Sequence, residues 1–356
     1  MADAKRLHDS AIIVDGLQTC QWSRSIFEEM RAGGLTAVNV SSLLWENFRE
    51  GIAYVSEWKH FLRRNSDLIR PVRTVADIHA AKVENKTGII IGWQNTSPLE
   101  DKLDYVEIFK DLGVGIMQLT YNTQNYSGAG YLEESDSGLT GFGKEVLAEM
   151  NRVGVLCDLS HVGDKTTADV IAYSKSPVCI SHVLPRALKD VRRNKPDELF
   201  AACAAKGGIV GISLFAPGLA AGNDATIDNY LDAMEHVIGV AGEDHVGIGT
   251  DFSLDRPRPG PWLLWANKDK GTARTLTEFG SVKINKPKGI ERMTAMPSLT
   301  SLMLARGWSE ETVLKLLGKN WLRVLDAAWA PSGVQKSCVL EDNLGVVTPT
   351  STESST

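Results

Sequence analysis

The chain has 356 residues, a length that suits two or three domains or one large α/β barrel. Lys and Arg number 38 and Asp and Glu number 44, so the formal net charge of −6 disfavours nucleic acid as a partner. Hydrophobic residues make up 43% and charged residues 23%, as is usual for globular proteins, and this composition excludes disorder of the whole chain.

The cysteines and the N-terminus bear on the location of the protein. The five cysteines are odd in number and form no Cys-x-x-Cys pair, which is typical of reduced thiols rather than of a disulfide framework. The first residues contain no apolar stretch of signal-peptide length, and no run of 18 apolar residues occurs. We therefore expect a cytoplasmic protein without a membrane partner.

Short apolar runs recur along the chain, and each ends in polar or small residues. There are eight of them: Ala11–Gly16, Leu35–Ser41, Gly88–Trp93, Gly113–Thr120, Gly154–Leu159, Pro177–Ser181, Gly208–Phe215 and Val246–Asp251. Because the runs are continuous rather than alternating, they are typical of parallel strands that are buried on both faces.

Segments with helical periodicity separate these runs. The segment Leu103–Leu112 stops at Gly113, and the segment Phe142–Val153 stops at Gly154. Eight strands that alternate with helices predict a single (β/α)₈ barrel over residues 1–330. A doubly wound sheet is the alternative, although it would usually need fewer strands.

Two segments fall outside the repeating pattern. Residues 255–288 are rich in Pro, Lys and Trp and follow the last run, so we expect a lid loop at the barrel mouth. Residues 331–356 lack periodicity and end in a run rich in Ser and Thr, so we expect a disordered C-terminal tail.

Polar side chains follow several runs, where a (β/α)₈ barrel places its active site. His161 and His182 end consecutive runs, and Asp251 ends the last one. Imidazole and carboxylate groups are usual ligands of Zn²⁺, so these three residues are candidate metal ligands. The alternative is that the histidines cap strands and that the aspartate caps a helix.

Four motifs and the intervals between them resemble the membrane (renal) dipeptidase family of zinc peptidases. They are Asp158-Leu-Ser-His161, Ser181-His182, Arg192-Arg-Asn194 and Gly249-Thr-Asp251-Phe. The segments 119–122 and 318–324 add to the resemblance, which spans about residues 7–329. It implies a (β/α)₈ barrel related to the amidohydrolases, two zinc ions bridged by a carboxylate, cleavage of dipeptides and, often, a homodimer.

The resemblance also implies roles for single residues. His161 and His182 correspond to ligands of one zinc ion. Asp251 corresponds to a ligand of the other zinc near the attacking water, and we expect it to act as the catalytic general base. Arg193 corresponds to the residue that grips the substrate's carboxylate, a task that suits a guanidinium fork. Tyr121 and its neighbour Asn122 are expected to bind the same substrate.

Three positions depart from the family's pattern. Leu17 and Thr19 stand where the family has the His-x-Asp ligands of the first zinc, and Gln94 stands at the bridging glutamate. Leucine cannot bind a metal, threonine is a poor ligand, and Gln94 offers only a weak neutral oxygen. We therefore expect at most one zinc ion. Cys20 can replace a lost ligand as a thiolate, and the alternative is a buried structural thiol.

Tryptophans also gather near the predicted mouth. Trp22, Trp45 and Trp93 follow the first three runs, and Trp262 and Trp265 lie in the predicted lid. An aromatic cage over the vacated metal position would favour an N-methylated or quaternary ammonium group. The alternative is that each tryptophan packs a loop.

The leading hypothesis is a dipeptidase-like hydrolase that acts on a C–N bond in a small carboxylate-bearing substrate, with at most one zinc. Two alternatives stay open at this point. One is a metal-free enzyme that acts on betaine-like or N-methyl amino-acid substrates. The other is a non-catalytic barrel that binds a small zwitterion or a partner protein.

Overall fold

The structure is a computed structural model that describes residues 2–41, 43–256 and 284–330. Its barrel strands are, in order around the barrel, β1 (Val14–Gln18), β2 (Ala37–Val40), β4 (Thr87–Trp93), β5 (Val114–Gln118), β6 (Leu156–Asp158), β7 (Cys179–Val183), β8 (Ile209–Ile212) and β9 (Val246–Ile248). All neighbours are parallel, and the pairing of β9 with β1 closes the ring. The single (β/α)₈ barrel is therefore confirmed, and each predicted run overlaps with one of these strands.

A further short strand, β3 (Ile69–Pro71), is indicated by no apolar run. It pairs only with the start of β4, where Ile69 lies opposite Thr87. A strand of three residues is too short to show a periodic pattern, so only the contact with β4 defines it.

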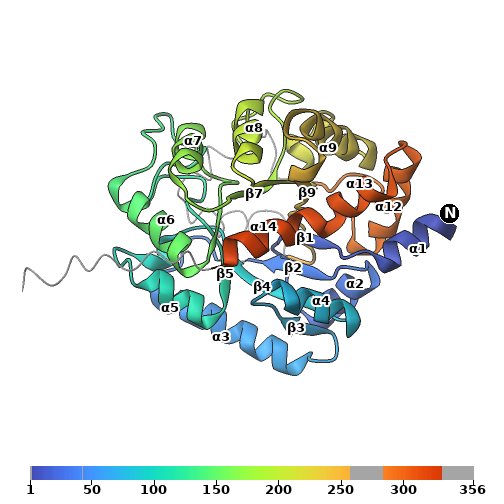
Figure 1. The fold of residues 1–356 in the computed structure, drawn as a ribbon, viewed down its shortest axis with the longest axis horizontal. Coiled ribbons are helices and arrows are strands. Elements are labelled where there is room, and N and C mark those ends of the chain that lie inside the picture. The colour runs from blue at the N-terminus through green and yellow to red at the C-terminus, as the bar shows by residue number, and fades with distance from the viewer. Residues whose placement is uncertain (1, 42, 257–283, 331–356) are drawn as a thin grey trace, which may run out of the picture.

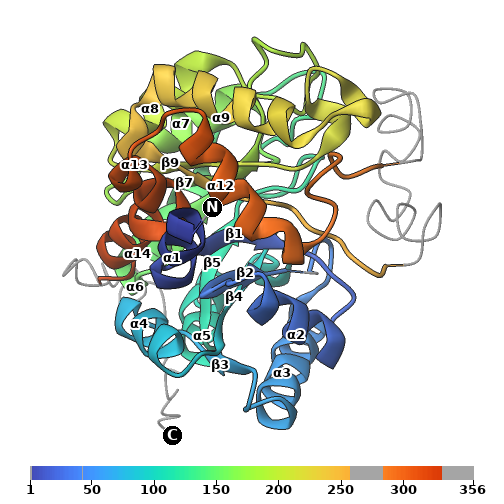
Figure 2. The same cartoon turned by 90° about the vertical axis from the view of Figure 1, so that its right-hand side faces the viewer.

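Helices surround the barrel (Figure 1), and Figure 2 shows α1 beside α12. They are α1 (Ala2–Ser10), α2 (Arg24–Ala32), α3 (Phe48–Arg64), α4 (Val75–Val83), α5 (Tyr105–Leu112), α6 (Gly141–Val153), α7 (Asp164–Tyr173), α8 (Asp197–Ala205), α9 (Ile227–Ala241), α12 (Met296–Ala305), α13 (Glu310–Leu314) and α14 (Asn320–Trp329). The glycines after α5 and α6 have φ of 108° and 79°, a left-handed conformation that ends a helix as the sequence predicts. None of the helices in the described ranges is long and apolar enough to cross a bilayer.

One end of the barrel is closed by α14, which crosses it in Figure 1. Trp321 donates its indole N–H to the carbonyl of Ile248 at 2.9 Å, and Trp329 donates to the carbonyl of Gly115 at 2.9 Å. Inward-facing strand residues and α14 form one buried cluster there. The carboxyl ends of the strands lie at the opposite end, where polar side chains are buried.

The predicted lid and tail fall largely on residues for which no structure is given. Residues 257–283 of the predicted lid, including Trp262 and Trp265, lie outside the described residues. The whole predicted tail, 331–356, lies outside them as well. Both therefore stay predictions.

Candidate active site

Two histidines meet at the carboxyl ends of neighbouring strands. His161 follows β6, and His182 lies within β7. Their exposed fractions are 8% and 0%, and their Nε2 atoms are 2.9 Å apart. The parallel pairing of β6 with β7 brings the two loops together, as the barrel topology predicts.

The outer ring nitrogens of both histidines are held by hydrogen bonds. His161 Nδ1 lies 2.6 Å from Asn122 Oδ1, an acceptor, so we assign the proton to this nitrogen. His182 Nδ1 lies 2.8 Å from Ser181 Oγ, whose hydrogen goes to Asp158 at 2.6 Å, so this nitrogen also donates. Each neutral imidazole then presents an Nε2 lone pair to the other ring, an arrangement that suits one shared metal ion.

Asp158 is the buried centre of this network, and the sequence alone gave it no role. Its carboxylate accepts hydrogen bonds from the backbone N–H and the hydroxyl of Ser160, at 3.1 and 2.6 Å. It also accepts from the backbone N–H and the hydroxyl of Ser181, at 2.8 and 2.6 Å. Burial raises the pKa of Asp158, and these four hydrogen bonds oppose that shift. The signal in the sequence is the Asp-x-Ser-His spacing before His161 together with the Ser-His pair.

Arg193 lies against both histidines and is 8% exposed. Its guanidinium donates to the carbonyl oxygens of Ser160 and His182, each at 2.8 Å, and one of its nitrogens lies 3.3 Å from His161 Nε2. Burial lowers the pKa of both histidines well below the usual value, and the charge of Arg193 lowers it further. Both imidazoles are therefore neutral at pH 7, which is the form that binds a metal.

Aromatic rings cover one side of the histidine pair. Tyr121 stacks on His161 with ring centroids 4.3 Å apart, and Trp45 packs edge-on against Tyr121 at 5.1 Å. Tyr131, which the sequence did not single out, lies 6.0 Å from His161 and 5.9 Å from the Arg193 guanidinium carbon. Burial raises the pKa of Tyr121, and the nearby Asp251 carboxylate adds to the rise.

Asp251 stands at the same end of the barrel, after β9. Its backbone is left-handed, with φ of 53°, and its N–H donates to the Leu17 carbonyl at 3.0 Å. The preceding residue, Thr250, is fixed by Asp15, which accepts its backbone N–H at 2.8 Å and its hydroxyl at 2.5 Å. This anchoring sets the position at which β9 delivers Asp251 to the mouth.

The other expected ligands do not complete a cluster. Within residues 2–41, 43–256 and 284–330, no group of three His, Cys, Asp or Glu side chains is arranged to hold a metal ion. Gln94 is buried after β4, where its backbone carbonyl accepts a hydrogen bond from the Gln118 side chain at 2.6 Å. The two imidazoles thus fit a metal as ligands, and within the described residues no third His, Cys, Asp or Glu side chain joins them.

The residues at the position of the family's first zinc are poor metal ligands in this chain. Leu17 is 1% exposed within β1, and the buried hydroxyl of Thr19 has no hydrogen-bond partner among the described residues. Cys20 packs in the core and donates its thiol to the Phe252 carbonyl at 3.4 Å. Burial raises the pKa of Cys20 to about 12, which favours a structural thiol over a thiolate ligand.

The structure does not bring Trp22, Trp45 and Trp93 together. Trp93 is 1% exposed and packs against Phe109 of α5, with centroids 4.5 Å apart. Trp22 packs against Trp58 of α3 at 5.0 Å. Trp93 belongs to the core between barrel and helices, and the half-buried Trp22 packs against that core. Among the described residues, Trp45 contacts Tyr121 of the site, whereas the ring contacts of Trp22 and Trp93 lead to α3 and α5. These contacts do not support a three-tryptophan cage, which stays a prediction together with the betaine-like alternative.

The chain matches one known protein family and several of its curated members. The model of membrane dipeptidase (Peptidase family M19) matches residues 25–260 and 277–336. Dipeptidase 3 of Rattus norvegicus is 26% identical over 282 residues, which cover 78% of this chain and 52% of that protein. Dipeptidase tcpJ of Claviceps purpurea is 28% identical over 306 residues, covering 83% and 64%. The chain spans about half the length of most of these curated relatives.

Solved structures are similar over nearly their full length. The amidohydrolase from Pseudomonas aeruginosa is 49% identical with a TM-score of 0.88, and the match covers 92% of this chain and 99% of that chain. A metallo peptidase from Rhodobacter sphaeroides, liganded with a phosphinate mimic of the dipeptide L-Ala-D-Ala, is 20% identical with a TM-score of 0.74, covering 90% and 100%. At 20% identity, the similarity to the Rhodobacter sphaeroides structure shows a shared fold.

Proposed function

Because the chain belongs to the membrane dipeptidase family, Peptidase family M19, we propose that it hydrolyses a C–N bond in a small carboxylate-bearing substrate such as a dipeptide. We propose that one zinc ion binds between His161 and His182. The observation that carries this proposal is the 2.9 Å approach of two Nε2 atoms whose Nδ1 atoms both donate hydrogen bonds.

A zinc ion bound there would lower the pKa of a bound water to about 7 and polarise a carbonyl group. The chain's own residues supply the remaining functions. Arg193, whose plane is fixed by two backbone carbonyls, binds the substrate's carboxylate. Asp251 accepts a proton as the general base. Tyr121 stacks on His161 and keeps that face of the imidazole away from water.

One zinc rather than two follows from the residues at the first metal position. Leu17 offers no ligand atom, and Thr19 and Gln94 offer neutral oxygens, which bind zinc poorly. Dipeptides are the first substrates to screen, because the similar Rhodobacter sphaeroides protein binds a dipeptide mimic. The expected homodimer and the cytoplasmic location stay predictions.

Metal content per subunit tests the proposal most directly. We expect elemental analysis to find about one zinc in the wild type and none in a His161→Ala, His182→Ala double variant. The matched control is a His60→Ala, His79→Ala variant, because both residues are exposed on helices. Two zinc ions per subunit would contradict the vacated first site. No zinc, together with ligand binding without turnover, would favour the non-catalytic barrel, and turnover in a chelator would favour the metal-free enzyme.

A further inference from the structure

A second pocket lies in the outer wall of the barrel, away from the strand ends that carry the histidines. Its volume is about 250 Å³. It opens between α3, the end of β3 and the start of β5, where β4 first pairs with β5 at Ile91 and Val114. β3 pairs with residues 87–89 of β4, and β5 pairs with β4 only from Ile91 onward. The pocket opens between β3 and β5, where β4 has neither strand beside it.

The inner surface of this pocket is apolar. Val72, Ile89 and Ile91 are at most 6% exposed and form part of its lining, and Leu62 of α3 and Leu112 of α5 complete it. Burying an apolar chain against these side chains is favourable by about 25 cal/mol per Å² of surface removed from water. The lining therefore suits a hydrocarbon group.

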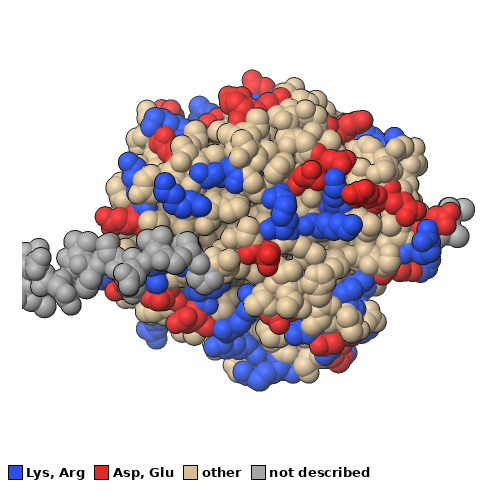
Figure 3. Space-filling view, in the orientation of Figure 1, with Lys and Arg blue, Asp and Glu red and all other residues tan. Residues whose placement is uncertain are grey.

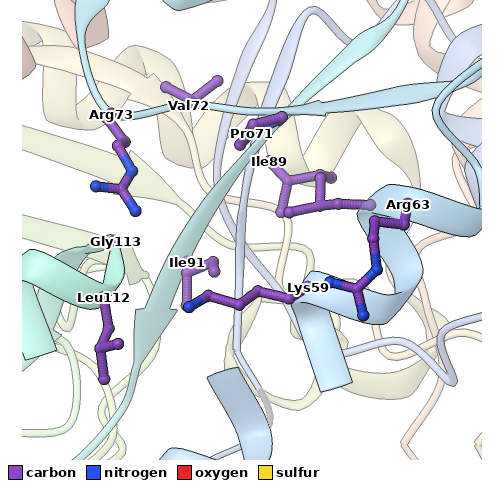
Figure 4. A pocket seen from close by; sticks show the side chains of 10 residues that line it. Lys59, Arg63, Pro71, Val72, Arg73, Ile89, Ile91, Leu112 and Gly113 are labelled. Carbon is purple, nitrogen blue, oxygen red and sulfur yellow. The ribbon is translucent and has the colours of Figure 1, made fainter. Parts of the chain in front are cut away.

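The rim of the pocket carries three positive charges and no carboxylate. Figure 4 shows Lys59 extending across the pocket toward Ile91, while the Arg73 guanidinium points in from the opposite side. Arg63 is the third. Figure 3 shows Lys and Arg gathered over the region that α3 occupies in Figure 1.

These cations have little to neutralise them. Within the described ranges, Lys59 makes no hydrogen bond or ion pair, and neither Arg63 nor Arg73 has a side-chain ion pair. Among the described residues, Arg63 forms a hydrogen bond with the His60 ring at 2.9 Å, and Arg73 donates from its side chain to the carbonyl of Asp111 at 3.2 Å. The backbone N–H of Arg73 donates to the Asp77 carboxylate at 3.0 Å. Like charges around one apolar pocket repel each other, and an anion bound between them would relieve that repulsion.

We infer that this pocket binds an amphiphilic carboxylate, with the head group between Lys59 and Arg73 and the hydrocarbon chain against Ile89 and Ile91. The volume of about 250 Å³ suits a short hydrocarbon chain such as that of octanoate. The inference does not depend on the proposed hydrolase function, because the pocket contains none of its residues.

Methyl NMR spectroscopy of the full chain tests the site without any activity assay. On titration with octanoate we expect saturable shifts of the Ile89 and Ile91 methyl signals, and weaker binding at high salt. Octanol, which has the same chain without the charge, is expected to bind about two- to fivefold more weakly, because it gains no ion pair with the exposed cations of the rim. Equal binding of octanol, or shifts spread evenly over the protein, would overturn the inference.

Reversing the charge of Lys59 is the second test of the site. Lys59→Glu is expected to weaken octanoate binding about tenfold, since repulsion replaces attraction at the rim. The matched control is Lys175→Glu on the far side of the barrel, which is exposed and should leave binding unchanged. Unchanged affinity in Lys59→Glu would overturn the head-group position. Octyl phosphate that binds more than about tenfold tighter than octanoate would overturn the assignment of a carboxylate.

Discussion

The Nε2 atoms of His161 and His182 face each other across 2.9 Å, and neither carries a proton when Asn122 and Ser181 accept the Nδ1 hydrogens. Two lone pairs at this distance repel unless a cation lies near both. Arg193, 3.3 Å from His161 Nε2, supplies part of that positive charge, and a zinc ion would supply more. The networks behind the rings thus hold the site ready for a cation.

Ser181→Ala removes the acceptor that fixes His182. The His182 ring is then free to place its proton on Nε2, where it blocks metal binding. Zinc affinity, measured by competition with a chromogenic chelator, is expected to fall about 10- to 100-fold. Ser174→Ala, a similarly buried serine beyond α7, is the control and should bind zinc like the wild type. Equal affinity in the two variants would refute the assigned proton positions.

The Asp251→Asn variant tests whether Asp251 acts as the general base or as a zinc ligand. As the general base, Asp251 should be needed for turnover but not for the metal, so kcat falls about 10²- to 10⁴-fold while the zinc content stays unchanged. Dipeptide hydrolysis and elemental analysis on the same preparation check this. Loss of zinc in the variant would instead make Asp251 a ligand.

Arg193→Gln tests the recognition of the carboxylate. We expect KM for a dipeptide to rise about 10- to 100-fold, because a charge-assisted hydrogen bond is lost. A dipeptide with an amidated C-terminus lacks the carboxylate, so the variant and the wild type should cleave it at similar rates. The neighbouring Arg192→Gln is the control, since Arg192 is exposed. An equal loss on both substrates would assign Arg193 a structural role only.

Asp15 predicts a dependence of stability on pH. Burial raises its pKa from 3.8 to about 6, so the folded state binds the proton more tightly than the unfolded state. Between pH 7 and pH 5 this should increase the free energy of unfolding by about 1 kcal/mol relative to Asp15→Asn. Urea unfolding of both proteins at the two pH values measures the difference. Exposed Asp326→Asn should track the wild type, and an identical pH dependence in Asp15→Asn would disprove the shift.

The tryptophans should fall into two classes. Trp93→Ala removes a buried ring from the contact with Phe109 and should lower the free energy of unfolding by about 3–5 kcal/mol. Trp45→Ala should instead raise KM, since Trp45 supports the Tyr121 ring that covers His161. Denaturant unfolding and dipeptide kinetics distinguish the two. A raised KM in Trp93→Ala with an unchanged free energy of unfolding would support the hypothesis of an aromatic cage.

The sequence by itself predicted the barrel, which the structure confirms, and it pointed to the candidate site residues at the barrel mouth. Continuous apolar runs record strands that are buried on both faces, and the residue after each run lies at the barrel mouth because all strands are parallel. His161, His182 and Asp251 were found in this way. The β3 strand was not predicted, because a strand of three residues is too short to show a periodic pattern of apolar residues.

Only the tertiary structure decided how these residues act together. Trp22, Trp45 and Trp93 follow consecutive runs alike, yet Trp93 is buried against α5 and the half-buried Trp22 packs against α3. The face on which a side chain lies depends on the packing of neighbouring elements. The roles of Asp158 and Ser181 depend on contacts across β6 and β7. Hydrogen-bond partners from different strands have no signature in a linear sequence, since distance and direction arise only when the barrel closes.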